Sequence, residues 1–171
     1  MTSYVALLRA VNVGGTGKLP MTELKRMCEA VGFTDVRTYI ASGNVVFRSR
    51  TKEASVKAAL EKALAAYAGK HVDVLVRSTA EMQAVYEANP FAEAPGNRVV
   101  AIFLDAVPPD DLGIGGQQDE RIAAGERELY VHYGDGMADS KLKIRAAAKG
   151  TARNINTVGK LAEMLQELDK K

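Results

Sequence analysis

The chain has 171 residues, a mass of 18.4 kDa and a formal net charge of +2. Hydrophobic residues make up 47% and charged residues 26% of it, which supports a folded core and excludes a disordered chain, a collagen-like or coiled-coil rod and a disulfide scaffold. The length allows one domain of ordinary size, or two small ones that share an interface. None of these values points to an activity.

The cysteine count and the N-terminal sequence predict the compartment. Cys28 is the single cysteine, so no intrachain disulfide can form, and a reducing environment is indicated. The first residues carry no basic segment of the kind that opens a signal peptide. The apolar run from Val5 to Leu8 is far too short to span a bilayer. We therefore expect a cytoplasmic protein with no membrane partner.

The first 78 residues predict the element order β-α-β-β-α-β. We expect a buried strand at Tyr4–Ala10 and a helix at 20–31 that starts near Pro20. A hairpin around Ser42-Gly43-Asn44 pairs Val36–Ala41 with Val45–Arg48. A second helix at Lys52–Ala68 and a closing strand at Val72–Arg77 follow. Gly32 is a natural C-terminal cap for the first helix, with Phe33 placed to fold back on it. This order is that of the ferredoxin-like split βαβ arrangement, an α+β fold with one sheet and both helices on one face.

The second half, residues 79–171, predicts a more irregular α+β unit that packs with the first as one compact body. Ser78 and Glu81 fit a capping box at the start of a short helix, and the continuous apolar run from Val99 to Leu104 predicts a central strand. A hairpin of Glu120–Ala124 with Leu129–Tyr133 is expected next, followed by a helix at Ser140–Ala148. A loop at Gly150–Arg153 then leads to a last helix at Asn156–Leu168.

The small net charge hides an uneven distribution along the chain. The charge is +6 over residues 1–78, −9 over 79–139 and +5 over 140–171. Lys141, Arg145 and Lys149 follow at intervals of four, which predicts a basic stripe on one face of the expected helix. Such a stripe can attract phosphates or an acidic partner, or it can neutralise the acidic middle of the same chain. Both readings stay open.

A glycine-rich loop, Gly14-Gly15-Thr16-Gly17-Lys18, lies between the first strand and the first helix. Backbone amides and a helix N-terminus can hold a phosphate at such a position. The loop is not a P-loop, because that pattern requires glycine at Asn12 and a hydroxyl residue at Leu19. The glycines can also serve only to let the chain turn.

Residue types typical of catalysis or metal binding are sparse. Cys28 falls on the apolar face of the first helix, as a core residue would. His71 has no sequence neighbour that suggests a dyad, and His132 alternates with Leu129 and Val131, so it points away from their face, alongside Tyr130. Asp135 and Asp139 lack the ligand pattern of a calcium loop. We expect no metal site and no cofactor, and no catalytic residue can be assigned.

Five segments together resemble a known family. They are Tyr4–Gly15, Lys18–Met21, Thr38–Phe47, Asn89-Pro90-Phe91 and Arg153–Val158. With these segments the chain resembles the bacterial domain of unknown function 1697 family over nearly its whole length. The resemblance implies an α+β fold with ferredoxin-like halves and supplies no activity. Ile155 departs from the pattern, where an aromatic residue is expected. If that ring stacks on a ligand in the family, this chain lacks the stacking contact; if the position lies in the core, isoleucine replaces the ring without harm.

The polar and glycine residues of these segments are the candidate ligand site. The set is Arg9, Asn12, Gly14, Gly15, Lys18, Ser42, Asn44, Arg153, Asn154, Asn156 and Thr157. Asparagine and glycine are also turn and cap formers. In the split βαβ unit we expect the loop after the first strand and the hairpin turn at opposite ends of the sheet unless a strand extends or bends, hence two clusters. Arg9 and Asn12 are expected near the Arg153–Thr157 segment if the halves pack end to end.

Three functions remain open at this stage. The first is a cytoplasmic binding module for a phosphate-bearing ligand, either a nucleotide or another phosphorylated small molecule, or nucleic acid, because of the glycine-rich loop and the basic tail. The second is a small-molecule enzyme with a general acid or base such as His132. The third is a protein-interaction or oligomerisation module that uses the acidic middle. The oligomeric state is not predicted.

Overall fold

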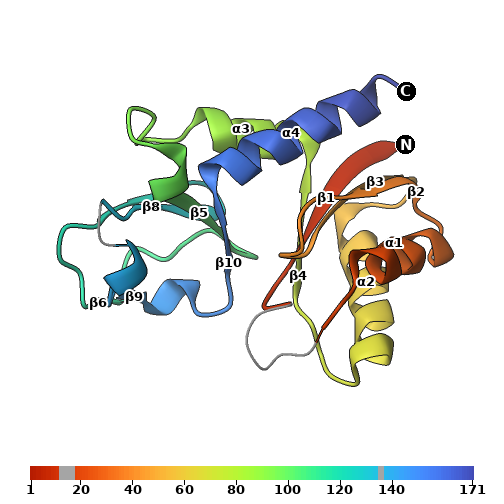
Figure 1. Ribbon diagram of the computed structural model, residues 1–171, viewed down its shortest axis with the longest axis horizontal. Coiled ribbons are helices and arrows are strands. Elements are labelled where there is room, and N and C mark those ends of the chain that lie inside the picture. The colour runs from red at the N-terminus through yellow and green to blue at the C-terminus, as the bar shows by residue number, and fades with distance from the viewer. Residues whose placement is uncertain (12–17, 135–136) are drawn as a thin grey trace. The chain divides into compact units, whose positions relative to one another are not determined.

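The computed structural model describes residues 1–11, 18–134 and 137–171, except for the side chain of Ala138. The described chain is a mixed α+β structure with antiparallel sheets, which confirms the expected fold class (Figure 1). It divides into two compact units, Met1–Met82 with Leu161–Lys171 and Gln83–Lys160. The end of the chain thus groups with the first unit, whereas the sequence division placed it in the second. That the two halves pack as one compact body stays a prediction.

Unit one contains a four-stranded sheet in the order β2-β3-β1-β4, with every neighbouring pair antiparallel. The strands are β1 Thr2–Leu8, β2 Thr34–Thr38, β3 Asn44–Ser49 and β4 Val74–Ser78. Together with the helix that follows β1 and the one that follows β3, this order is compatible with the ferredoxin-like split βαβ arrangement.

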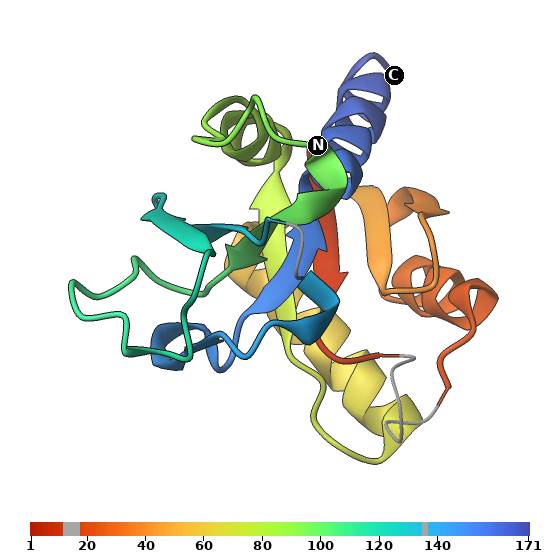
Figure 2. The ribbon, with the colours of Figure 1, turned by 60° about the vertical axis from the view of Figure 1, so that its left-hand side comes forward.

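Two helices, α1 Met21–Ala30 and α2 Glu53–Ala68, lie together on one side of this sheet (Figure 2). Alternate residues of β1, namely Tyr4, Ala6 and Leu8, point into the apolar core that these helices share. A strand presents every second residue to the same face, so this alternation fixes which side of the sheet the helices cover. Leu24 of α1 and Leu60 of α2 are fully buried in the same core.

The C-terminus of α1 forms the cap that the sequence predicts. The N–H of Phe33 donates to the carbonyl of Cys28 (3.0 Å), and the N–H of Gly32 donates to that of Glu29 (3.1 Å). This is the hydrogen-bond pattern of a Schellman motif, which requires a left-handed residue, and Gly32 has φ +98°. The ring of Phe33 then stacks on Phe47 of β3 with a centroid separation of 4.2 Å, which joins the helix end to the core.

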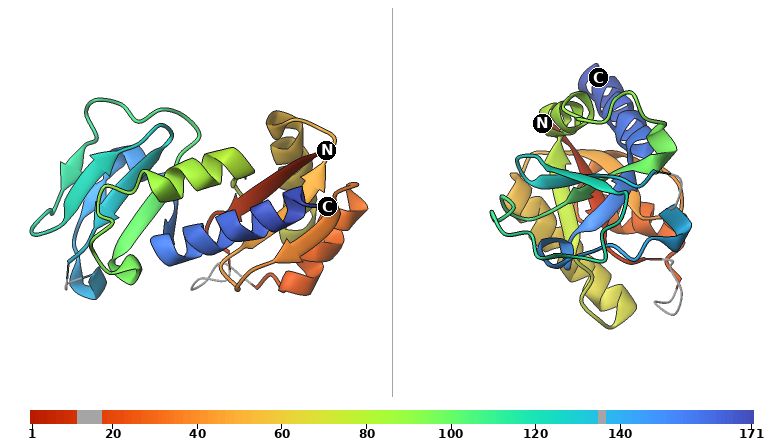
Figure 3. Two further views of the ribbon diagram at one scale, coloured as in Figure 1. Left: turned by 90° about the horizontal axis from the view of Figure 1, so that it is seen from above. Right: turned by 90° about the vertical axis from the view of Figure 1, so that its left-hand side faces the viewer.

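Unit two contains a four-stranded antiparallel sheet in the order β10-β5-β8-β7 and a small pair of strands, β6 and β9 (Figure 3). The strands are β5 Val99–Phe103, β6 Ile114–Gly115, β7 Arg121–Ala124, β8 Glu128–His132, β9 Lys143–Ile144 and β10 Thr151–Asn154. The remaining helices are α3 Thr79–Glu87, which begins in unit one, and α4 Ile155–Asp169, which ends there. The expected central strand and the hairpin are confirmed. Short 3₁₀ turns occupy Gly96–Arg98, Met137–Asp139 and Arg145–Ala147.

The expected helix over Ser140–Ala148 is wrong. Its middle is the short strand β9 followed by a 3₁₀ turn. The N–H groups of Arg145 and Ala146 donate to the carbonyls of Gly113 and Leu112 (both 3.0 Å), and not to carbonyls four residues earlier in the chain as a helix requires. A helix of nine residues gains little on its own, so these tertiary bonds prevail. The basic stripe on one helix face therefore does not exist, and Arg145 lies 3.6 Å from the Asp111 carboxylate. For Arg145, this contact supports the interpretation that the basic tail neutralises the acidic middle of the chain.

The expected loop over Gly150–Arg153 is also wrong, because this segment forms most of the edge strand β10. Thr151 is paired with Phe103 and Asn154 with Val100, in antiparallel register with β5. The segment lacks the long apolar run that marks a strand in sequence, since only one of its faces is buried.

Candidate functional site

A cavity of about 300 Å³ opens in unit one beside the end of β1. Four stretches of chain supply its walls: the residues after β1, those before α1, the end of α2 and the segment that leads into β4. The lining residues are Ala10, Val11, Lys18, Leu19, Leu64, Tyr67, Ala68, Lys70 and Val72. This volume lies at the lower end of the range for small-molecule sites.

The walls of this cavity combine an apolar floor with two cations. Leu19, Leu64 and Val72 are buried members of the core of unit one. Lys18 and Lys70 stand at its exposed edge. Of the described residues that line it, none is acidic. An anion at this edge would meet two ammonium groups, whose attraction solvent and salt screen in part because both side chains are exposed.

The backbone turns sharply just after β1, at the residues that form one wall of the cavity. Ala10 has φ 56°, a left-handed conformation that residues other than glycine adopt at a cost. Just before it, the N–H of Arg9 donates to the carbonyl of Asp73 (3.0 Å), which extends the pairing of β1 with β4 by one residue. Arg9 is partly buried and does not line the cavity. Among the other residues predicted for this loop, Asn12, Gly14 and Gly15 lie outside the described residues.

The hairpin residues Ser42 and Asn44 have structural contacts. The side-chain amide of Asn44 is fully buried and donates to the carbonyl of Tyr39 and to the hydroxyl of Ser42, both at 3.0 Å. These bonds close the turn between β2 and β3. The expectation that this turn and the end of β1 lie at opposite ends of the sheet is wrong, because β1 and β3 are antiparallel with Leu7 opposite Asn44.

The Arg153–Thr157 segment belongs to unit two and joins β10 to α4. Asn154 caps α4, since its Oδ1 accepts the N–H of Thr157 (2.9 Å). Arg153 is buried, donates to the Thr151 hydroxyl (2.7 Å) and the Ala152 carbonyl (3.0 Å), and burial lowers its pKa to about 10. Asn156 is exposed. The expected approach of Arg9 to this segment stays a prediction.

Ile155, where the resemblance predicts an aromatic residue, is buried as the first residue of α4. A buried position at a helix start is filled by any apolar side chain of suitable volume. Isoleucine in place of an aromatic ring at this position therefore changes how the side chains pack in the interior of unit two.

The cysteine and one histidine are placed as the sequence predicts. Cys28 is fully buried in α1, and this burial raises the pKa of its thiol to about 12, so it does not form a reactive thiolate. His132 leaves β8 on the face opposite Leu129 and lies 3.2 Å from the Arg121 guanidinium and near the Phe91 ring. Neither of the two cavities described here is lined by His132.

A second cavity in unit one has a different chemical character. It has a volume of about 550 Å³ and lies at the start of α2. Hydroxyl residues supply much of its polar lining, with Arg50 as the one basic side chain among the described lining residues. Two of the hydroxyls, on Ser49 and Thr51, are bonded to each other at 2.9 Å. The first cavity has two basic side chains in its described lining and the second has one.

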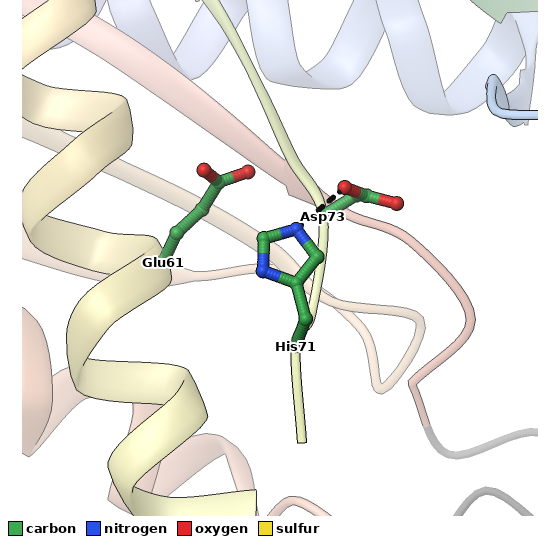
Figure 4. Close-up of side chains that lie close together, drawn as sticks. All are labelled: Glu61, His71 and Asp73. Carbon is green, nitrogen blue, oxygen red and sulfur yellow. Dashed lines mark hydrogen bonds and ion pairs between the residues drawn. The ribbon is translucent and has the colours of Figure 1, made fainter.

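Three further side chains converge beside β4, and sequence analysis did not predict their grouping. Glu61 of α2, His71 and Asp73 bring one oxygen or nitrogen each within 4.8 Å of one another (Figure 4). The imidazole Nε2 of His71 lies 2.8 Å from Oδ1 of Asp73, so the interpretation that no sequence neighbour of His71 suggests a dyad is wrong. The signal in the sequence was the spacing of two, which places both side chains on one face of an extended segment.

The fold and this site define a mixed α+β protein with antiparallel sheets and a cationic cavity at one end of its first sheet. Residues 1–130 match the family model described as "Protein of unknown function (DUF1697)", and the chain belongs to this family. It is similar in structure to a conserved bacterial protein, SP0830 from Streptococcus pneumoniae, with a TM-score of 0.77, 23% sequence identity and coverage of 96% of this chain and 98% of that one. No curated protein matches the chain. None of the helices that the described residues form combines the length and apolar character needed to cross a bilayer.

Proposed function

We propose that this protein binds a small phosphate-bearing molecule, of the size of a mononucleotide, in the cavity between the start of α1 and the end of α2. The observation that carries the proposal is that two lysines, Lys18 and Lys70, line an apolar cavity with no acidic residue among its described lining.

The two lysines supply the recognition of phosphate. An ammonium group carries a full positive charge and donates hydrogen bonds. A phosphate monoester carries a charge between −1 and −2 near neutral pH, so two lysines match it. Hydrogen bonds between charged groups are about twice as strong as neutral ones.

The apolar floor supplies recognition of the remainder of the ligand. Leu19, Leu64 and Val72 offer surface against which a flat apolar ring can pack. Tyr67 is 46% exposed at the same cavity, and an exposed aromatic ring is a stacking surface for a base. A cavity of about 300 Å³ has room for one nucleotide and excludes a duplex, which favours a small molecule over nucleic acid.

Residues of the basic tail are not part of the proposed site. Arg145 is paired with Asp111, and the polar groups of Arg153 and Asn154 are engaged in contacts within unit two. Binding of nucleic acid to this tail is a separate outcome that the experiment can detect, because it would fall steeply as salt is raised.

The proposal is tested by calorimetric titration with AMP, adenosine and inorganic phosphate as probes. We expect AMP to bind more tightly than adenosine, and Lys18→Ala and Lys70→Ala each to weaken AMP binding about tenfold or more, the loss of one charged hydrogen bond. Lys25→Ala is the matched control, because Lys25 is an exposed lysine of α1 that does not line the cavity. Equal affinity of the three variants, or no binding of AMP, would contradict the proposal.

A further inference from the structure

The outer edge of β4 carries a compact set of nitrogen and oxygen ligands. Glu61 projects from α2, and His71 and Asp73 project from the segment that leads into the strand (Figure 4). One potential ligand atom from each lies within 4.8 Å of the other two. From this geometry we propose that Glu61, His71 and Asp73 bind a divalent transition-metal ion of the zinc type. The proposal does not depend on the phosphate ligand.

Glu61 is held in place before any ion binds. Its Oε2 accepts the N–H of Val74 (3.0 Å) and lies 3.1 Å from the Lys57 ammonium. Its side chain is only 19% exposed. Both of these contacts are made by the same oxygen, and a carboxylate has a second one, Oε1, which we assign to the metal. A ligand that is already ordered loses less conformational entropy on binding.

His71 and Asp73 form the open side of the site. Their side chains are 63% and 38% exposed, and the Nε2 to Oδ1 distance is 2.8 Å. A metal ion takes the place of the proton that these two atoms share, and neutral imidazole and carboxylate are the forms that bind metals. Two ligand atoms on one zinc ion lie about 3.3 Å apart. On metal binding the distance between His71 Nε2 and Asp73 Oδ1 therefore lengthens slightly, and both side chains move towards Glu61. The exposure of His71 leaves room for this movement.

The donor set selects the class of metal. Imidazole suits zinc, copper, iron and nickel, and carboxylates suit magnesium, calcium and manganese. One imidazole and two carboxylates are therefore typical of an intermediate ion such as Zn²⁺, which binds more tightly than Mn²⁺ to a given N/O site. Three protein ligands leave at least one coordination position for water or another molecule. Lys70 and Val72, on either side of His71 in the chain, line the cationic cavity.

A structural role, hydrogen bonding to the backbone of the edge strand, explains the position of Glu61 but not those of His71 and the Asp73 side chain. β4 is an edge strand, and an edge exposes unpaired N–H and C=O groups. The Glu61 carboxylate accepts the N–H of Val74, and the Lys57 ammonium donates to the Val74 carbonyl, so the pair caps both groups of that residue. This capping does not involve His71 or the side chain of Asp73. These two residues therefore discriminate a metal site from an edge cap.

The test is a titration of the full chain with Zn²⁺ alone, and with Mn²⁺ for comparison, followed by calorimetry and by the shift in Tm. We expect one equivalent of Zn²⁺ to bind saturably, more tightly than Mn²⁺, and to raise Tm as a ligand of the native state does. His71→Ala and Asp73→Asn each weaken Zn²⁺ binding about tenfold or more, since each removes one ligand. His132→Ala, which removes the other histidine of the chain, leaves it unchanged.

Glu61→Gln separates the metal role of Glu61 from its capping role. The amide oxygen of glutamine still accepts the N–H of Val74, so the Tm without metal stays near that of the native chain while Zn²⁺ affinity falls. The proposal is overturned if the native chain shows no saturable Zn²⁺ binding in the micromolar range, or if His71→Ala and His132→Ala weaken it equally. Because no phosphate ligand is present, this result is independent of the AMP experiment.

Discussion

The N–H of Leu8, the last residue of β1, donates a hydrogen bond of 2.9 Å to the carbonyl of Gly43. This bond holds the turn between β2 and β3 against the end of β1. Gly43 has φ +88°, and a Cβ at this position would lie 2.6 Å from Cγ2 of Val11. Val11 in turn lines the cationic cavity. The glycine therefore sets how closely the hairpin approaches one wall of the candidate site.

Replacement of Gly43 by alanine should destabilise the protein beyond the cost of a left-handed alanine. That conformation costs about 1 kcal/mol, and the clash with Val11 adds about 1–3 kcal/mol of overpacking. Gly32→Ala is the control, since Gly32 has φ +98° and a Cβ there would meet no atom within 4 Å. Urea unfolding of both variants measures the difference. Equal losses of unfolding free energy would show that the contact with Val11 is unimportant.

The capping box at the start of α3 should be worth a measurable amount of stability. The N–H of Ser78 donates to Oε1 of Glu81 (2.8 Å), and the N–H of Glu81 donates to Oγ of Ser78 (3.3 Å). Ser78→Ala removes one of these bonds and should cost about 1 kcal/mol of unfolding free energy. Ser78→Thr keeps the hydroxyl and should cost much less. A thermal or urea melt in which both variants behave alike would rule out a role for the cap.

The buried thiol of Cys28 should make stability depend on pH above about 9. Burial raises the pKa of this thiol from the ordinary 9.0 to about 12. In the unfolded chain the thiol ionises near pH 9, whereas in the folded chain it stays protonated, so its contribution is intact below pH 9 and declines as the pH rises from 9 towards 12. At pH 10 the loss is about 1 kcal/mol.

The comparison that isolates this effect is between the native chain and Cys28→Ala. Urea unfolding at pH 8 and pH 10 should show a larger drop in unfolding free energy for the native chain, by about 1 kcal/mol. The same drop in both proteins would mean that other groups account for it. At pH 8 the folded native thiol should also resist a thiol reagent that reacts at once when urea is added.

Much of the fold could be predicted because its signals are local. Gly32 with Phe33 marks a helix end, Ser78 with Glu81 marks a helix start, and the apolar run from Val99 marks a central strand. Each depends on residues within a few positions of each other, and each is confirmed. The prediction of a helix after Ser140 is wrong because the backbone of this segment forms hydrogen bonds to Leu112 and Gly113, a pairing that no local pattern reveals.

The candidate site could be predicted only in part for the same reason. Lys18 was singled out from its position before the first helix, and it does line a cavity. Lys70 and Tyr67 were missed, because their link to Lys18 comes from the packing of α2 beside α1 across more than forty positions of sequence. Asn44 and Asn154 were predicted as candidate ligand contacts, and their described amide and carbonyl contacts are those of a turn and a helix cap.

The most direct measurement of the central claim is a map of backbone amide shifts by NMR as AMP is added. We predict that the residues that move most are those of the cavity, with Leu19, Leu64, Tyr67 and Val72 among them, and that the Lys18→Ala variant loses these shifts while Lys25→Ala keeps them. Shifts confined to the basic segment 141–160, or no shifts at saturating AMP, would contradict the account.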